Sequence, residues 1–268
     1  MKKIFCLAFA ILFAVLVPAA RAAQLTNDAP EVVAARKARD RASVEDLQKI
    51  VAKAQHDADE SKSFDAYLRL ALFEVWLCEA AEDRGQEALF KPAAETGVAA
   101  AEKAVALNPQ SSDAHQLLGD LLSQLIPHVF GGGMKYGKRS TDEMDQALAL
   151  DPKNVNAYVS RAISYYYSPE TFGGSKEKAF ELLNKAAGID AKADSPHIWL
   201  AMFYLDANRR DDALREINLA RSANPDRAFT NYIYSQLTAP AKKGSDKKTA
   251  TPPAKKPGSE QQGRMGGR

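Results

Sequence analysis

The sequence predicts an all-α protein, a solenoid of stacked antiparallel helical hairpins, with extended loops inside two of the hairpins. Three observations support this fold class. A phrase of small and aliphatic residues that ends in Asn or Asp, usually with Pro after it, recurs along the chain. A ring-bearing residue follows three copies of the phrase at a constant distance, and small residues then recur at helical spacing. A repeat of this kind is the signature of a solenoid.

The recurring phrase occupies residues 104–109, 147–152, 186–191 and 220–225, and its copies begin 43, 39 and 34 residues apart. Asn or Asp followed by Pro favours a turn, and the residue before a proline is disfavoured in a helix. Each copy therefore marks the end of one hairpin and the start of the next. Ala191 replaces the proline in the third copy.

The ring-bearing residues His115, Tyr158 and His197 open the first helix of a hairpin. Positions three and four apart lie on one face of a helix, and a small residue there lets a second helix approach closely. Ala179 and Ala213 begin the same pattern in two of the second helices. The predicted elements are a helical lead-in over 23–62, a looser hairpin over 64–109, and hairpins over 113–152, 156–191 and 195–225, with the repeat domain covering 63–239.

A four-helix bundle or a coiled coil is the competing fold, because it would show the same apolar helical spacing. A bundle needs no recurring turn phrase at repeat-sized intervals. The recurring turn phrase of this sequence therefore favours the solenoid.

The copies resemble the tetratricopeptide repeat (TPR), whose unit of about 34 residues follows W-x2-L-G-x2-Y, then A-x3-F-x2-A, then a proline. His115, Leu118, Gly119 and Leu122 match the first half of this unit, while Arg161 departs from it in the next copy. The resemblance covers most of the chain after residue 62. It implies a scaffold that binds a protein or peptide along a concave groove lined by the first helices.

Carried over by position, the resemblance implies ten groove residues. The apolar members form a patch that docks a helix or an extended segment, unless the segment 229–237 folds back as a cap and covers them. Both alternatives stay open. The implied residues are Asp113, Gln116, Asp120, Asn156, Val159, Ile163, Tyr166, Ser195, Ile198 and Met202.

Two hairpins are longer than the repeat, by nine and five residues, and the extra residues fall between their two helices. Both insertions, within 127–137 and 168–174, contain Phe-Gly-Gly. In a stacked array they should lie along one edge, and we expect Phe130 and Phe172 to tuck against the hairpins. A phosphate-binding loop is not favoured, because the glycines follow a helix and do not match the Walker pattern.

The first 22 residues are typical of a cleaved signal peptide: two lysines, an apolar run and a small-residue site before Ala23. The run is shorter than the roughly 20 residues of a spanning helix. Cys6 lies at the front of the run, which argues against a lipoprotein. We therefore expect a periplasmic or secreted protein, in which Cys78 is the remaining cysteine.

Charge is divided unevenly along the chain. Residues 240–268 carry +6, whereas residues 23–239 carry −7. The basic segment is rich in Lys, Pro and Gly and has little to bury, so we expect a disordered tail. Such a tail can remain solvated or contact an anionic membrane surface peripherally; no nucleic acid is expected.

The sequence contains no pattern that supports catalysis, a cofactor or a metal. Helical spacing scatters the carboxylates that follow His56 around the helix, so they do not form a metal site. We therefore expect a non-enzymatic, exported scaffold or adaptor whose partner is a protein or peptide of the cell envelope. The alternative is a soluble periplasmic component that assists a TRAP-type solute transporter, binding a small ligand or the transporter's binding protein. The sequence leaves the oligomeric state open.

Overall fold

The computed structural model describes residues 29–239, and all regular secondary structure in that range is helical. The predicted signal peptide and basic tail lie outside the described residues. Two short 3-10 turns, η1 (Ile126–His128) and η2 (Glu170–Phe172), interrupt the helices. The α-helices are α1 (Pro30–Asp40), α2 (Val44–Ser61), α3 (Phe64–Asp83), α4 (Glu87–Leu107), α5 (Ser112–Leu125), α6 (Gly132–Leu150), α7 (Val155–Tyr167), α8 (Lys176–Ile189), α9 (Asp194–Asp206), α10 (Arg210–Ala223) and α11 (Ala228–Thr238).

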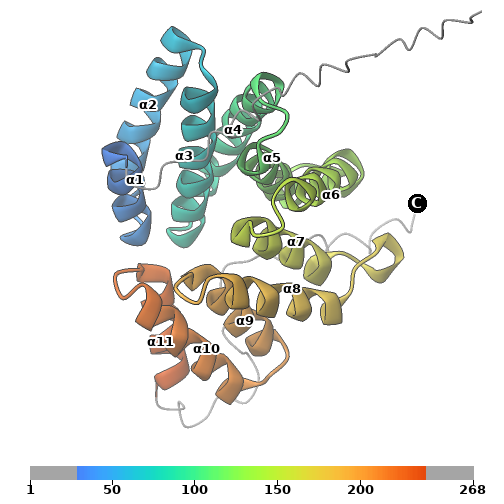
Figure 1. Cartoon of the computed structure of the whole chain (residues 1–268). Coiled ribbons are helices and arrows are strands. Elements are labelled where there is room, and N and C mark those ends of the chain that lie inside the picture. The colour runs from blue at the N-terminus through green and yellow to red at the C-terminus, as the bar shows by residue number, and fades with distance from the viewer. Residues whose placement is uncertain (1–28, 240–268) are drawn as a thin grey trace, which may run out of the picture.

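Consecutive helices pair into hairpins: α3 with α4, α5 with α6, α7 with α8 and α9 with α10. The first helices of successive hairpins also contact one another, α3 with α5, α5 with α7 and α7 with α9. The array winds so that α11 lies below α1 and α3 in Figure 1. α1 and α2 pack on α3, and α11 packs on α10. The predicted all-α solenoid of hairpins is confirmed.

The recurring phrase builds the same turn three times. The side chains of Asn108, Asp151 and Asp190 each accept a hydrogen bond from the backbone N–H two residues later, at 2.9 to 3.2 Å. Ser111 and Asn154 then accept from the third residue of the next helix and cap it. The phrase thus forms the turn after one hairpin, and the capping residue two positions after it satisfies a backbone donor at the start of the next helix.

The ring-bearing position contacts the preceding turn. The Tyr158 hydroxyl donates to the carbonyl of Pro152 at 3.2 Å, and the His115 ring nitrogen Nε2 lies 3.1 Å from the carbonyl of Pro109. The other ring nitrogen of His115 lies 2.6 Å from Glu143 on α6, and this hydrogen bond raises the pKa of His115. His115 is therefore a buried structural residue that ties the two helices of its hairpin together.

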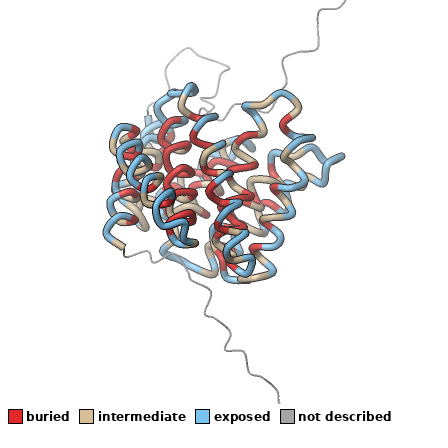
Figure 2. Tube along the Cα trace, turned by 90° about the horizontal axis from the view of Figure 1, so that it is seen from above, coloured by how far each residue is buried: buried red, intermediate tan, exposed pale blue. Residues whose placement is uncertain are grey.

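Small residues set how closely the two helices of a hairpin pack. A Cβ added at Gly119 on α5 would lie 2.8 Å from Met144 Cγ on α6, and Ser140 donates to the Gly119 carbonyl at 2.8 Å. Ala179 and Ala213 are fully buried at equivalent interfaces. Figure 2 shows the buried residues along the inside of the array. Most of the buried apolar residues form two clusters, one from α1 to α5 and one from α7 to α11.

Candidate binding surface

The structure buries the apolar part of the implied groove. Val159, Tyr166, Ile198 and Met202 are buried, and Ile163 is partly buried. Ile198 and Met202 belong to a buried cluster that runs from α7 to α11. These residues therefore do not form an open apolar patch. Whether they contact a partner stays a prediction.

Tyr166 is held in place on both sides. Its ring stacks on Phe203 with the centroids 3.7 Å apart, and its hydroxyl donates to Asp206 at 2.8 Å. Lys176 lies against the same ring, with its ammonium 4.7 Å from the Tyr166 ring centroid. Tyr166 thus joins α7 to α9 and holds the second cluster together.

The polar members of the implied groove have mixed exposure. Gln116 is buried, Asp113, Asp120 and Ser195 are partly buried, and Asn156 is exposed. Gln116 donates to Asp120 at 3.0 Å, one helical turn further along α5. Burial, with the neighbouring carboxylate of Glu79 adding to it, raises the pKa of Asp120 to about 7.

Glu79 links Asp120 to a group of carboxylates at the end of α3. Glu82 and Asp83 are exposed residues in the last turn of α3, although nearby protein atoms reduce the hydration of their carboxylates. Burial and repulsion from adjacent carboxylates raise the pKa of each to about 7. We call Glu79, Glu82, Asp83 and Asp120 the acidic surface. Carboxylates held this close together favour a cation beside them.

One cation already lies at this surface. Arg227, which precedes α11, reaches Glu79 at 3.2 Å and Asp194 at 3.3 Å. Burial alone would raise the pKa of Asp194, but Arg227 and Arg39 hold it below its usual range. Arg39 lies in the last turn of α1, so a cation from α1 and one from the start of α11 both act on Asp194 of α9. This bridge closes the array.

The Phe-Gly-Gly loops differ from our expectation. Phe130 is fully exposed and Phe172 is 79% exposed, so neither ring tucks against its hairpin. The expectation was wrong because the glycines fix the backbone in a way that turns the rings outward. Met134, in the first turn of α6, is also exposed.

The two loops share one backbone geometry. The first glycine after each phenylalanine is left-handed, with φ of 68° at Gly131 and 86° at Gly173. A Cβ on the second glycine would collide with the backbone carbonyl six residues earlier, of Ile126 at Gly132 and of Ser168 at Gly174. Only glycine satisfies both requirements without strain. The two Phe-Gly-Gly segments therefore adopt the same loop conformation and need glycine for the same reasons.

Gly174 offers a direct check of this geometry. We expect Gly174→Ala to lower the free energy of unfolding by about 1–3 kcal/mol, because the new methyl group must push the Ser168 carbonyl aside. Gly133→Ala is the matched control: no heavy atom lies within 4 Å of its added Cβ, so it should be neutral or slightly stabilising. Urea unfolding followed by circular dichroism measures both. Equal effects of the two substitutions would contradict the conclusion that the Ser168 carbonyl leaves no room for a side chain at Gly174.

No protein-family model matches the sequence, and no curated protein matches it either. Among solved structures, TTC0263, a thermophilic TPR protein of Thermus thermophilus, aligns with a TM-score of 0.56 and 16% identity. The alignment covers 77% of this chain and 98% of that one. The chain has the tetratricopeptide-repeat fold.

Two further tetratricopeptide-repeat structures are similar over a comparable length. YrrB, described as a TPR protein with an unusual peptide-binding site, shares 12% identity over 76% of this chain and 97% of its own, with a TM-score of 0.40. MamA from Desulfovibrio magneticus RS-1 shares 14% identity over 75% of this chain and 98% of its own, also with a TM-score of 0.40.

The tetratricopeptide-repeat pattern alone does not identify the acidic surface. Glu79, Glu82 and Asp83 lie beyond the length of a normal first helix, because α3 has 20 residues whereas α5 has 14. The run Glu79-Ala-Ala-Glu-Asp directly after a long apolar stretch is the signal that finds them. A repeat aligned to the start of α3 leaves this run outside the unit.

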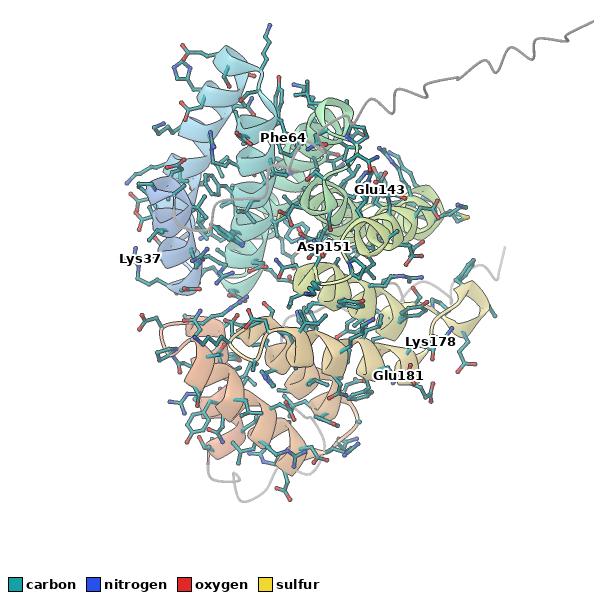
Figure 3. All side chains as sticks on the ribbon, in the orientation of Figure 1. Lys37, Phe64, Glu143, Asp151, Lys178 and Glu181 are labelled. Atoms are coloured by element: carbon teal, nitrogen blue, oxygen red, sulfur yellow. The ribbon has the colours of Figure 1, made fainter. Side chains whose placement is uncertain are left out.

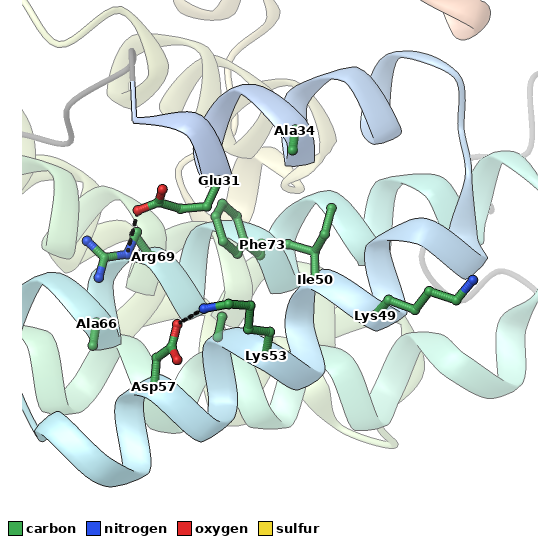
Figure 4. Close-up of a pocket in the computed structure, with 10 residues that line it drawn as sticks. Glu31, Ala34, Lys49, Ile50, Lys53, Asp57, Ala66, Arg69 and Phe73 are labelled. Carbon is green, nitrogen blue, oxygen red and sulfur yellow. Dashed lines mark hydrogen bonds and ion pairs between the residues drawn. The ribbon is translucent and has the colours of Figure 1, made fainter.

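Within residues 29–239 no group of His, Cys, Asp and Glu side chains is arranged to hold a metal ion. The same residues contain no helix that is long and apolar enough to cross a membrane. A pocket of about 310 Å³ lies between α1, α2 and α3, with Phe73 and Ile50 among the residues that line it. Ion pairs of Arg69 with Glu31 and of Lys53 with Asp57 also line it (Figure 4). These charged groups are already paired with one another.

Proposed function

We propose that this chain is a non-catalytic, exported scaffold that binds a protein partner, and that the acidic surface holds a basic segment of that partner. Arg227 carries the proposal, because its guanidinium lies between Glu79 and Asp194 at 3.2 and 3.3 Å. An arginine or lysine of a partner could form ion pairs of the same kind with Glu82, Asp83 and Asp120. Hydrogen bonds between charged groups are stronger than those between neutral ones.

The charge distribution supports a cationic partner. Residues 23–239 carry −7, and a surface with one sign of charge steers oppositely charged partners toward it. The rigid stack of hairpins keeps the carboxylates in place before binding, so less conformational entropy is lost on association. Export rests on residues 1–22, which have the features of a signal peptide.

The test measures peptide binding to the chain beginning at Ala23 by fluorescence anisotropy, with a lysine- and arginine-rich peptide and an acidic peptide of equal length. We expect the double variant Glu82→Gln, Asp83→Asn to weaken binding of the basic peptide about tenfold or more. Binding should also weaken as the pH falls from 8 to 6, because carboxyls with a pKa of about 7 lose their charge.

The matched control is the double variant Glu45→Gln, Asp46→Asn, which removes two exposed carboxylates from α2. It should leave the affinity within about twofold. Equal losses in the two double variants, or equal binding of the acidic peptide, would refute the proposal. Sequencing the amino terminus of protein purified from the envelope fraction tests export: a start at Ala23 supports it, and a start at Met1 opposes it.

A further inference from the structure

The two ends of the array meet without a shared apolar core. One buried cluster runs from α1 to α5, which we call the first half, and the other from α7 to α11, the second half. Within residues 29–239, no extensive helix packing joins α1, α2 or α3 to α9, α10 or α11. Figure 3 shows the two halves, with Lys37 marking α1 and Glu181 marking α8. The contact between the ends therefore depends on charged side chains.

The two ion pairs of Arg227 differ in how far solvent reaches them. Arg227 pairs with Asp194 of α9 at 3.3 Å, and both side chains are 13% exposed. It also pairs with Glu79 of α3 at 3.2 Å, and the Glu79 side chain is 37% exposed. The pair with Asp194 lies within the second half, whereas the pair with Glu79 crosses to the first half. Because solvent screens an exposed pair more than a buried one, the crossing pair is the weaker of the two.

Glu79 also belongs to the acidic surface. Its carboxylate acts electrostatically on Asp83 and on Asp120, so a cation that approaches either residue comes under the influence of Glu79 as well. Arg227 would keep Asp194 if it lost Glu79. The loss would not leave a buried arginine without an anion, which would be costly. A competing cation therefore has to replace only the exposed member of the bridge.

We propose that a basic segment of the partner competes with Arg227 for Glu79, so that its binding separates α11 from α3. The inference rests on the proposed function, because the acidic surface must first hold a cationic segment. Neither apolar cluster has to change, since the boundary crosses neither of them. Binding and opening are then linked: the partner favours the open form, and a change that frees Glu79 from Arg227 favours binding.

Spin labels on the two halves measure the opening. Gln48→Cys near the start of α2 and Ser222→Cys near the end of α10 place labels at exposed positions. Cys78 is buried and should stay unlabelled. For the chain beginning at Ala23, we expect pulsed electron paramagnetic resonance to give a longer distance when the lysine- and arginine-rich peptide is added. The pair Gln48→Cys, Gln110→Cys lies within the first half, so its distance should not change.

Two substitutions test the bridge itself. With Glu79→Gln, the distance between the halves should already be long without peptide and should change little when peptide is added. With Arg227→Gln, Glu79 is free, so the peptide should bind about fivefold more tightly or better. The matched controls are Glu102→Gln and Arg139→Gln, which break an exposed ion pair between α4 and α6. Both should keep the distance, its response to peptide and the peptide affinity of the parent.

Fluorescence anisotropy of the peptide, measured with the same proteins, separates the possible failures. If the peptide does not bind, the acidic surface is refuted and the coupling falls with it. If the peptide binds but the distance between the halves stays the same, the coupling alone is overturned. The coupling also fails if the label pair within the first half lengthens equally. It fails again if Arg227→Gln and Arg139→Gln change the affinity alike.

Discussion

Glu74→Gln is expected to stabilise the protein at pH 8 and to have little effect near pH 5. Glu74 on α3 is 3% exposed, and its Oε2 has no hydrogen-bond partner among the described residues. Burial raises the pKa of Glu74 to about 8. The folded chain therefore keeps a proton that the unfolded chain loses above its ordinary pKa of 4.5, and stability falls as the pH rises between these two values.

The expected size of this effect is up to about 4 kcal/mol by pH 8, since each unit of pKa corresponds to about 1.4 kcal/mol. Glutamine keeps the shape of the side chain but does not titrate. Urea unfolding of both proteins at pH 5, 6.5 and 8 measures the difference. Glu181→Gln, which changes an exposed carboxylate on α8, is the control. A difference between parent and Glu74→Gln that does not grow with pH would contradict the prediction.

Arg227→Ala is expected to lower the free energy of unfolding by about 2 kcal/mol at pH 7. The substitution removes the arginine of the ion pair from Asp194, whose side chain is 13% exposed, and leaves only the more distant charge of Arg39. Removing one partner of a buried ion pair costs about 3–5 kcal/mol, and the partial exposure of Glu79 reduces this figure. Small-angle scattering should also show a larger radius of gyration, because the bridge between Arg227 and α3 is lost.

Arg215→Ala is the control for Arg227. Arg215 pairs with Asp212 at 2.6 Å, but the pair is exposed and lies within one helix. Its removal should destabilise the protein much less than Arg227→Ala and leave the radius of gyration unchanged. If both substitutions destabilise equally, or if the radius of gyration is the same in Arg227→Ala and the parent, Arg227 does not close the array.

The repeat predicted the fold because each of its residues determines structure within a few positions along the chain. Asn108, Asp151 and Asp190 each shape a turn within a few residues, and Gly119 and Ala179 mark helix interfaces by size alone. The length of α3 was not predictable in the same way. From Ala66 to Ala81 it contains no Gly, Pro, Asn, Asp or Ser, so no turn residue marks where a repeat-sized helix would end.

Two features of the surfaces needed the three-dimensional structure. The outward direction of Phe130 and Phe172 depends on backbone angles at the glycines, which composition does not reveal; hydrophobicity alone predicted the opposite. The contact of Arg227 with Glu79 joins residues 148 positions apart, and periodicity within a hairpin carries no information about such a pair. The apolar groove residues lie on first helices, as expected, but their burial depends on how α7 and α9 pack together.

The bridge at Arg227 also limits how this protein can grow. Open solenoids lengthen by duplication of a repeat, since each unit contacts only its neighbours. Here an added hairpin would carry α11 away from α3 and separate Arg227 from Glu79. Lengthening this array therefore costs a contact between α3 and the segment before α11 that an open array lacks.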